Sequence, residues 1–342
     1  MKKYRLTALF FLTALTLSAC SPDAQNPVSQ DPPDSYQTAK GGETEILIHP
    51  GEWQLPGTLT LPDGEGPFPL VVFVHGSGPS DRDETMGKQK LFRDLASDLA
   101  QYGIASIRYD KRTYIYANKM QSKTNLTVKE ETIDDALQAV CFAQTTDRVD
   151  PNRVYIAGHS MGGYLIPRID QADTGNQVAG YISLAGSVRS IMELTIIQID
   201  YILSLDTSMS EAEKDAYKAP YLKADQAIKA LTEKDRGSST AIMGAYPTYW
   251  LDLADYRPDA EVSSISEPLL FLQGEHDYQV TMTDFDMWKT ALGDNPQASF
   301  VSYPNLSHSF VETPAMGTPD DYNTAARVDK KVAQDIRDFI LG

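Results

Sequence analysis

The amino-acid sequence predicts an α/β protein with a mostly parallel sheet that helices cover on both faces. Two observations support this fold class. From about residue 44 onward, apolar strand-like segments alternate with segments of helical spacing. In addition, residues 69–74 (PLVVFV) form a continuous apolar run, which is typical of a strand buried on both faces. Strands and helices that alternate in this way favour a parallel sheet between two helical layers.

The expected elements follow in order along the chain. Two strands at 44–50 and 52–61 are joined by a tight turn at Pro50-Gly51. Further strands are expected at 69–74, 104–109, 153–157, 179–184, 268–272 and 299–303, and helices at 91–102, 131–145, from residue 160 and at 325–341. These segments predict one core formed by residues 43–187 and 267–342.

Residues 188–266 contain no convincing strand. Residues 191–205 are apolar with helical spacing, and Ser208 and Ser210 are plausible N-cap residues for a following helix. We interpret this segment as a helical insertion that forms a cap over the carboxyl edge of the sheet, in which Tyr249 and Trp250 shape a pocket. A dimer interface is the alternative interpretation.

The first 42 residues differ in composition from the rest. A basic start precedes an apolar run at 6–17 and a Leu-Ser-Ala-Cys ending at Cys20, the pattern of a secretory signal peptide. The run is shorter than the roughly 20 residues of a membrane-spanning helix. The ending resembles the bacterial lipoprotein signal, which implies removal of residues 1–19, a lipid anchor on Cys20 and residence in the cell envelope. A plain signal peptide is the alternative. Residues 20–42, rich in proline, then form a flexible tether.

Composition excludes several classes of function. The formal charge of −17 argues against nucleic acid or anionic lipid as the main partner, because both require basic patches. The chain has two cysteines, so with Cys20 lipidated Cys141 has no disulfide partner, and its place on an apolar helix face predicts a buried core residue. Scattered histidines without a cysteine pair do not support a metal centre.

The stretch at residues 156–165, IAGHSMGGYL, places Ser160 between Gly158 and Gly162. A serine hydroxyl is a weak nucleophile until a neighbouring base takes its proton. One common kind of nucleophilic serine sits on a sharp turn from a strand into a helix, with a glycine two residues away on each side. Residues 153–157 read as a strand and 161–168 as the start of a helix. This context favours a nucleophile over a glycine-rich turn that contains a serine by chance.

Such a serine needs a histidine and an acid later in the chain. The five candidates are His49, His75, His159, His276 and His308. His308 is favoured because it lies in the loop between the last strand and the last helix. The acid should follow the preceding strand, where the chain reads Gly274-Glu275-His276-Asp277. The spacing after the glycine favours Asp277 as the acid that orients the imidazole, with Glu275 as its rival.

Hydrolysis through a serine also requires amide donors for the oxyanion. The amide of Met161, directly after the nucleophile, is one candidate. The second is expected from the small-residue loop at residues 75–79, His-Gly-Ser-Gly-Pro, and Ser77 is the preferred donor. A simple turn of small residues is the alternative for this loop.

These motifs resemble the α/β-hydrolase superfamily, and within it bacterial serine carboxylesterases of the dienelactone-hydrolase-like and prolyl-oligopeptidase-like groups. The resemblance rests on residues 75–83, 109–112, 158–163, 274–277 and 305–308, within a span of 44–342. It implies ester or acyl hydrolysis through an acyl-enzyme, without a metal or organic cofactor. Thr113-Tyr114 follow Asp-Lys-Arg where the family commonly has glycine, and serine stands where dienelactone hydrolases often have cysteine. The charged residues at 81–83 and 110–112 are interpreted as structural ion pairs.

The sequence therefore predicts a lipid-anchored serine hydrolase that acts on small-molecule carboxylic esters. Ser160 is the expected nucleophile, His308 the base and Asp277 the acid. A peptidase or amidase with the same triad is one alternative, and a surface lipoprotein that binds a ligand without catalysis is another. Acyl specificity and oligomeric state stay open.

Overall fold

An eight-stranded sheet runs through the computed structural model, which describes residues 41–342. The strand order is β1-β2-β6-β3-β7-β8-β9-β10. The strands are β1 (Gly42–Ile48), β2 (Leu55–Leu61), β3 (Phe68–Val74), β6 (Ala105–Tyr109), β7 (Val149–His159), β8 (Tyr181–Leu184), β9 (Leu269–Gly274) and β10 (Ala298–Tyr303). Within this sheet only the β1–β2 and β2–β6 pairs are antiparallel. The predicted fold class, a mostly parallel sheet, is confirmed.

Strand β3 shows why helices must cover both faces of this sheet. Its side chains alternate between the two sides: Val71 and Phe73 join one apolar cluster, whereas Leu70, Val72 and Val74 join the other. All five side chains are fully buried. Complete burial of one such side chain contributes roughly 1.5–3 kcal/mol, so each face of β3 has to be covered.

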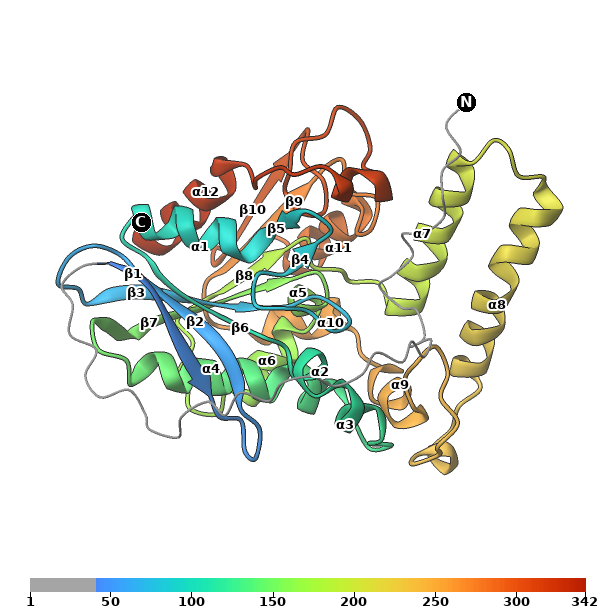
Figure 1. The fold of residues 1–342 in the computed structure, drawn as a ribbon, viewed down its shortest axis with the longest axis horizontal. Helices are drawn as coiled ribbons and strands as arrows, with labels where there is room; N and C mark the ends of the chain where they lie inside the picture. The colour runs from blue at the N-terminus through green and yellow to red at the C-terminus, as the bar shows by residue number, and fades with distance from the viewer. Residues whose placement is uncertain (1–40) are drawn as a thin grey trace, which may run out of the picture.

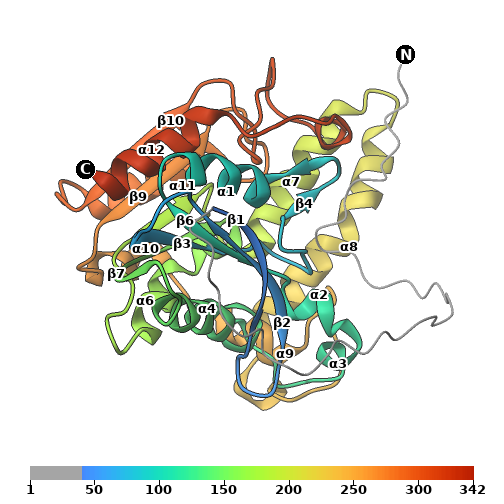
Figure 2. The same cartoon turned by 60° about the vertical axis from the view of Figure 1, so that its left-hand side comes forward.

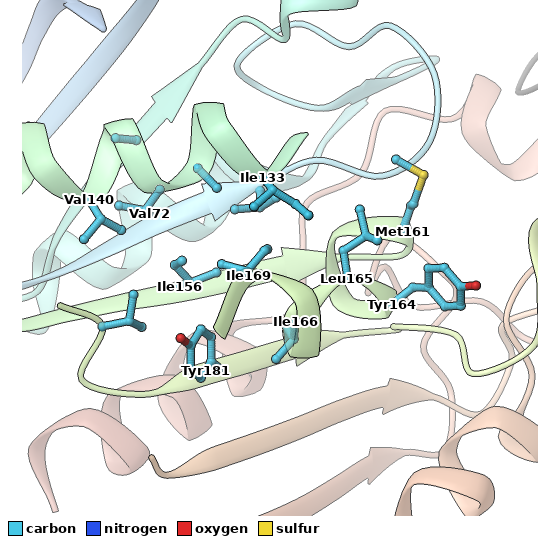
Figure 3. Packing of buried hydrophobic residues seen from close by; sticks show 14 of the residues in the cluster. Val72, Ile133, Val140, Ile156, Met161, Tyr164, Leu165, Ile166, Ile169 and Tyr181 are labelled. Carbon is cyan, nitrogen blue, oxygen red and sulfur yellow. The ribbon is translucent and has the colours of Figure 1, made fainter. Parts of the chain in front are cut away.

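Two helical layers provide this cover (Figure 1). Helices α1 (Leu91–Gln101) and α12 (Lys330–Leu341) pack on the face that receives Val71 and Phe73. Helix α4 (Asp134–Gln144), helix α6 (Ile166–Ala172) and helix α11 (Met282–Leu292) cover the other face. Figure 3 shows this second layer, where Val140 of α4 and Ile169 of α6 point toward Val72 and Ile156 of the sheet.

Between β8 and β9 the structure describes helices and no strand. They are α7 (Ile191–Leu205), α8 (Glu211–Lys229), α9 (Pro247–Leu253) and α10 (Pro258–Glu261), with short 3-10 turns. Helices α7 and α8 lie side by side beyond the end of the sheet (Figures 1 and 2). Ser190 and Ser210 cap them through reciprocal bonds with Glu193 and Glu213. Of the two predicted N-cap residues, Ser210 is therefore used.

The remaining elements depart from the sequence predictions in identifiable ways. Helix α11 was not predicted, and neither were the short strands β4 (Thr85–Met86) and β5 (Gln89–Lys90) or the short helices α2 (Arg112–Ile115) and α3 (Ala117–Gln121). Helix α12 begins only at Lys330, because the Asp329 side chain caps it by accepting from the Lys331 amide. Cys141 is half-buried rather than buried, with its Sγ 3.4 Å from Gln177 Oε1.

The predicted signal peptide, Cys20 and most of the predicted tether lie outside the described residues. Among the helices of residues 41–342, none is both long and apolar enough to cross a membrane.

Candidate active site

Ser160 occupies a strained turn between β7 and helix α5 (Met161–Tyr164). Its φ of 52° lies in the left-handed region, which residues with a side chain rarely adopt. The flanking glycines permit the close approach of neighbouring backbone. A Cβ on Gly158 would lie 2.4 Å from the carbonyl carbon of Gly162, and one on Gly162 would lie 2.4 Å from the Val74 oxygen. The sequence pattern thus corresponds to a turn that exposes Ser160 at the end of a central strand.

His308 and Asp277 meet in the adjacent loops. His308 Nδ1 lies 2.6 Å from Asp277 Oδ2, and both side chains are buried. Asp277 Oδ1 also accepts from the amides of Gln279 (2.7 Å) and Val280 (3.0 Å). These bonds fix the carboxylate. A carboxylate at Nδ1 favours the tautomer of His308 that carries its proton on Nδ1 and leaves Nε2 as the free base.

The loop of His308 lies directly against the turn of Ser160. His159 Nε2 lies 3.0 Å from the His308 carbonyl oxygen, and the two imidazole rings are 4.5 Å apart between centroids. The Ser160 hydroxyl makes no hydrogen bond to any residue of the described chain. Catalytic contacts of free enzymes are often long and tighten only in the substrate complex. The structure thus pairs the predicted base with the predicted acid and places the loop of His308 against the turn that carries Ser160.

The rival acid is located elsewhere. Glu275 Oε1 accepts from the Ser302 hydroxyl at 2.8 Å, and the neighbouring His276 places Nδ1 2.9 Å from the Thr313 carbonyl oxygen. Of the two carboxylates predicted for the acid, Asp277 is the one in contact with His308.

Both predicted oxyanion donors line the same cavity as Ser160. Ser77 follows β3, and Met161 opens α5. Within the described chain, neither amide donates to an acceptor, whereas the Gly76 amide donates to Glu84 Oε1 at 2.7 Å. The Ser77 and Met161 amides are therefore available to an oxygen bound at Ser160.

Helix α7 forms one wall of this cavity. Its residues Ile191, Leu194, Thr195, Gln198 and Ile202 line it. Tyr278, Gln279 and Val280 of the segment after Asp277 also line the cavity, as does Tyr221 of α8. The full set of lining residues is Ser77, Ser160, Met161, Tyr164, Ser187, Ile191, Leu194, Thr195, Gln198, Ile202, Tyr221, Tyr278, Gln279 and Val280.

The prediction that Tyr249 and Trp250 shape the pocket is wrong. Neither is among the lining residues, and both are buried in the apolar core. The Tyr249 hydroxyl instead lies 3.6 Å from the Met161 sulfur. Tyr249 thus contacts a lining residue from the apolar core, whereas Trp250 Nε1 donates to the Ile242 carbonyl.

Comparisons with known proteins identify the family of this chain. Residues 71–324 match the model of a family described as the alpha/beta hydrolase family. This chain belongs to the alpha/beta hydrolase family. It is 32% identical over 337 residues to "Esterase EstD" of Thermotoga maritima, a match that covers 98% of this chain and 74% of the relative. The hydrolase is therefore esterase-like.

Solved structures show the same fold at low sequence identity. Est1E of Butyrivibrio proteoclasticus with bound ferulic acid superposes with a TM-score of 0.53 at 15% identity, covering 86% of this chain and 98% of that one. A puromycin-hydrolyzing peptidase of Mycobacterium tuberculosis gives 0.55 at 15% identity, with coverages of 92% and 40%. A peptidase thus shares this architecture with the esterase-like chain, so the fold alone does not separate ester from peptide hydrolysis.

Buried and partly buried ion pairs tie down the loop after β3 and the segment after β6. Arg82 pairs with Asp110 at 2.9 Å, and Lys111 pairs with Glu131 at 2.8 Å. Two further pairs join Arg108 to Asp83 and Arg112 to Asp135. The charged stretches at 81–83 and 110–112 therefore form structural ion pairs, as the sequence analysis proposed.

Two residues near the site, Glu84 and His159, were missed by sequence reasoning. Glu84 Oε1 lies 3.1 Å from His159 Nδ1, and both side chains are buried. Burial opposes the ionisation of both groups, but the opposite charges outweigh it: the pKa of His159 is raised and that of Glu84 is lowered. No signal in the sequence distinguishes Glu84 from other loop carboxylates, and the sequence analysis considered His159 only as one of five candidate bases.

Proposed function

We propose that this esterase-like hydrolase cleaves carboxylic esters through an acyl-enzyme formed on Ser160. The observation that carries this proposal is the 2.6 Å contact between His308 and Asp277 in a loop packed against the strained Ser160 turn. His308 Nε2 takes the Ser160 proton as Oγ attacks the ester carbonyl, and Asp277 stabilises the imidazolium that results. The Ser77 and Met161 amides hold the oxyanion of the tetrahedral intermediate.

Collapse of that intermediate releases the alcohol, which receives the proton from His308. Water then attacks the acyl-enzyme with His308 again acting as base, and the carboxylic acid leaves. Each proton taken by His308 is returned within the same half-reaction, so the residues of this site balance the chemistry.

The cavity favours an ester over a peptide substrate. Its described lining residues include no carboxylate and no lysine or arginine. A peptidase that reads a free amino terminus needs an anionic partner for the ammonium group, because a buried charge is costly when unpaired. A small uncharged ester fits this lining of aliphatic, aromatic, amide and hydroxyl groups.

Replacement of the nucleophile tests the proposal. Ser160→Ala should lower turnover of p-nitrophenyl acetate by about 10⁴-fold or more, because no other group forms the acyl-enzyme. Initial rates, together with labelling by a fluorophosphonate probe and mass spectrometry of the labelled peptide, check it. Ser106→Ala, a buried hydroxyl on β6, is the control and should retain rate and labelling.

Near-normal turnover in Ser160→Ala would refute the assignment. An unlabelled wild-type protein would instead favour a ligand-binding protein without catalysis. Faster cleavage of aminoacyl nitroanilides than of esters would favour the peptidase alternative.

We also propose that Cys20 carries the lipid anchor. Metabolic labelling with an alkyne fatty acid should tag the wild-type protein and leave Cys20→Ala untagged. Two acyl signals anchor a protein stably, so only the wild type should remain in the membrane fraction.

A further inference from the structure

We propose that Glu84 and His159 act as a buried positioning pair that holds the oxyanion loop and the base loop in register with Ser160. This inference rests on the proposed function, because it assigns a role relative to Ser77 and His308. Three segments far apart in the sequence meet at the pair: the loop after β3, the turn after β7 and the loop after β10.

The first link runs from Glu84 to the oxyanion loop. Glu84 Oε1 accepts from the Gly76 amide at 2.7 Å, and Lys111 Nζ donates to the Gly76 carbonyl at 2.9 Å. Both backbone polar groups of Gly76 are therefore fixed by buried charged side chains, and its carbonyl lies in the same peptide unit as the Ser77 N–H. Gly76 immediately precedes Ser77, so these bonds set the direction of the Ser77 amide.

The second link runs from His159 to the base loop. His159 Nδ1 faces Glu84 at 3.1 Å, while Nε2 lies 3.0 Å from the His308 carbonyl oxygen. An imidazolium donates from both nitrogens at once, whereas a neutral imidazole donates from only one. Only the protonated form of His159 can therefore donate from Nε2 to the His308 carbonyl and also face Glu84 with a charged N–H at Nδ1.

Backbone geometry at Glu84 supports a dedicated role. Glu84 has a φ of 48°, in the left-handed region that costs about 1–3 kcal/mol for a residue with a side chain. The strained conformation aims the carboxylate into the protein, where it is 4% exposed. A loop carboxylate without such a role would adopt a relaxed conformation and face solvent.

The surrounding groups favour a protonated His159 over a range of pH. Asp277 and His308 face it from the loops after β9 and β10, and Phe92 of α1 presents a ring edge. His75 and Lys111 lie beyond Glu84. The net effect raises the pKa of His159, mainly through Glu84 against the opposing effect of burial. The pair is therefore intact until the pH rises through this raised value.

The pair predicts an alkaline limit of activity that belongs to His159. His308 must be neutral to accept the Ser160 proton, which sets the acidic limb of the rate profile. Deprotonation of His159 removes one of its two links and should lower kcat at higher pH. KM should change little, because neither residue lines the substrate cavity.

Glu84→Gln tests this inference, because the amide retains an acceptor for Gly76 but removes the charge. We expect kcat for p-nitrophenyl acetate to fall about 10- to 100-fold, as for misplaced catalytic groups. The alkaline limb should move toward acid by about one pH unit or more, because His159 loses its counter-charge. Asp98→Asn is the matched control. It removes a buried carboxylate of α1 that accepts from Arg327, and the pH–rate profile of this variant should match that of the wild type.

An unshifted alkaline limb and unchanged kcat in Glu84→Gln would overturn the inference, as would an equal shift in Asp98→Asn. If Glu84→Gln does not fold, the His159→Gln variant tests the inference instead. This variant has no titrating group at position 159, so the alkaline limb of its rate profile should disappear. Persistence of that limb in folded His159→Gln would also refute it. Fluorophosphonate labelling of Ser160 separates the outcomes: a labelled Ser160 with unshifted profiles rejects only the pair, whereas an unlabelled Ser160 rejects the proposed function.

Discussion

At the scale of single residues, Asp277 illustrates how burial makes one carboxylate irreplaceable. It is fully buried and accepts from Gln279, Val280 and the Gln273 side chain in addition to its contact with His308. An ionised carboxylate satisfies all these donors because it only accepts. An amide in its place brings two donors into a site built from donors.

Asp277→Asn should therefore lower kcat by roughly 10³- to 10⁴-fold, because His308 is left in the wrong tautomer. Steady-state kinetics with p-nitrophenyl acetate measure it. Glu275→Gln is the control, since Glu275 bonds Ser302 rather than His308, and it should stay within about twofold of the wild type. Equal losses in the two variants would contradict the assignment of the acid.

At the scale of elements, α7 determines the shape of the substrate cavity. Its five lining residues have spacings of three, four, seven and eleven from Ile191, which places them on one face of the helix. Gln198 Nε2 donates to the Gln279 carbonyl at 3.1 Å, and the Tyr201 ring stacks on Tyr278 at 5.4 Å. These contacts tie the helix to the loop that carries Asp277.

Ile202→Trp should shorten the cavity. We expect kcat/KM for p-nitrophenyl octanoate to fall by about 10-fold or more relative to the acetate, since overpacking costs roughly 1–3 kcal/mol. Ile197→Trp, a half-buried residue of α7 outside the lining, should leave the ratio of the two substrates unchanged. An unchanged ratio in Ile202→Trp would show that acyl chains do not enter along α7.

The sequence predicted the elements that local residue patterns determine, but not the contacts that depend on tertiary packing. The buried run of β3 and the glycines around Ser160 are local signals, because two-sided burial and tight backbone contact restrict residue type directly. The partners of Glu84 and the burial of Tyr249 depend on tertiary packing, which local spacing does not encode. Helix α11 was missed because its apolar residues are interrupted by charged ones, and the helix is recognised mainly by its packing against β9.

At the scale of the whole molecule, buried titratable groups act in opposite directions on stability. Burial lowers the pKa of His75 to about 4, and its Nε2 contacts the Asp81 carbonyl. Burial raises the pKa of Asp135 to about 7 and that of Asp170 to about 6. Between about pH 4 and 6.5 the unfolded chain protonates His75 while the folded protein does not, so this group destabilises the fold as the pH falls. Asp135 and Asp170 have the opposite effect: between about pH 4 and their raised pKa values the folded protein holds protons that the unfolded chain has lost, so these two groups destabilise the fold as the pH rises.

A difference measurement isolates His75. Between pH 6.5 and 5 the wild type should lose about 2 kcal/mol of unfolding free energy relative to His75→Gln, as expected for a group that must stay neutral when folded. Urea unfolding at the two pH values measures it. His49→Gln, in an exposed position of the β1–β2 hairpin, should behave as the wild type. Parallel pH dependence in all three proteins would contradict the role of His75.

The strand order also has a consequence for synthesis. The Ser160 turn and β3 belong to the first half of the chain, whereas Asp277 and His308 follow β9 and β10, which add to the sheet beside β8 near the end. Under the proposed mechanism, a growing chain that has folded through β8 carries the nucleophile without its base. We therefore expect hydrolase activity only after β9 and β10 have docked, so that completion of the chain itself acts as the switch.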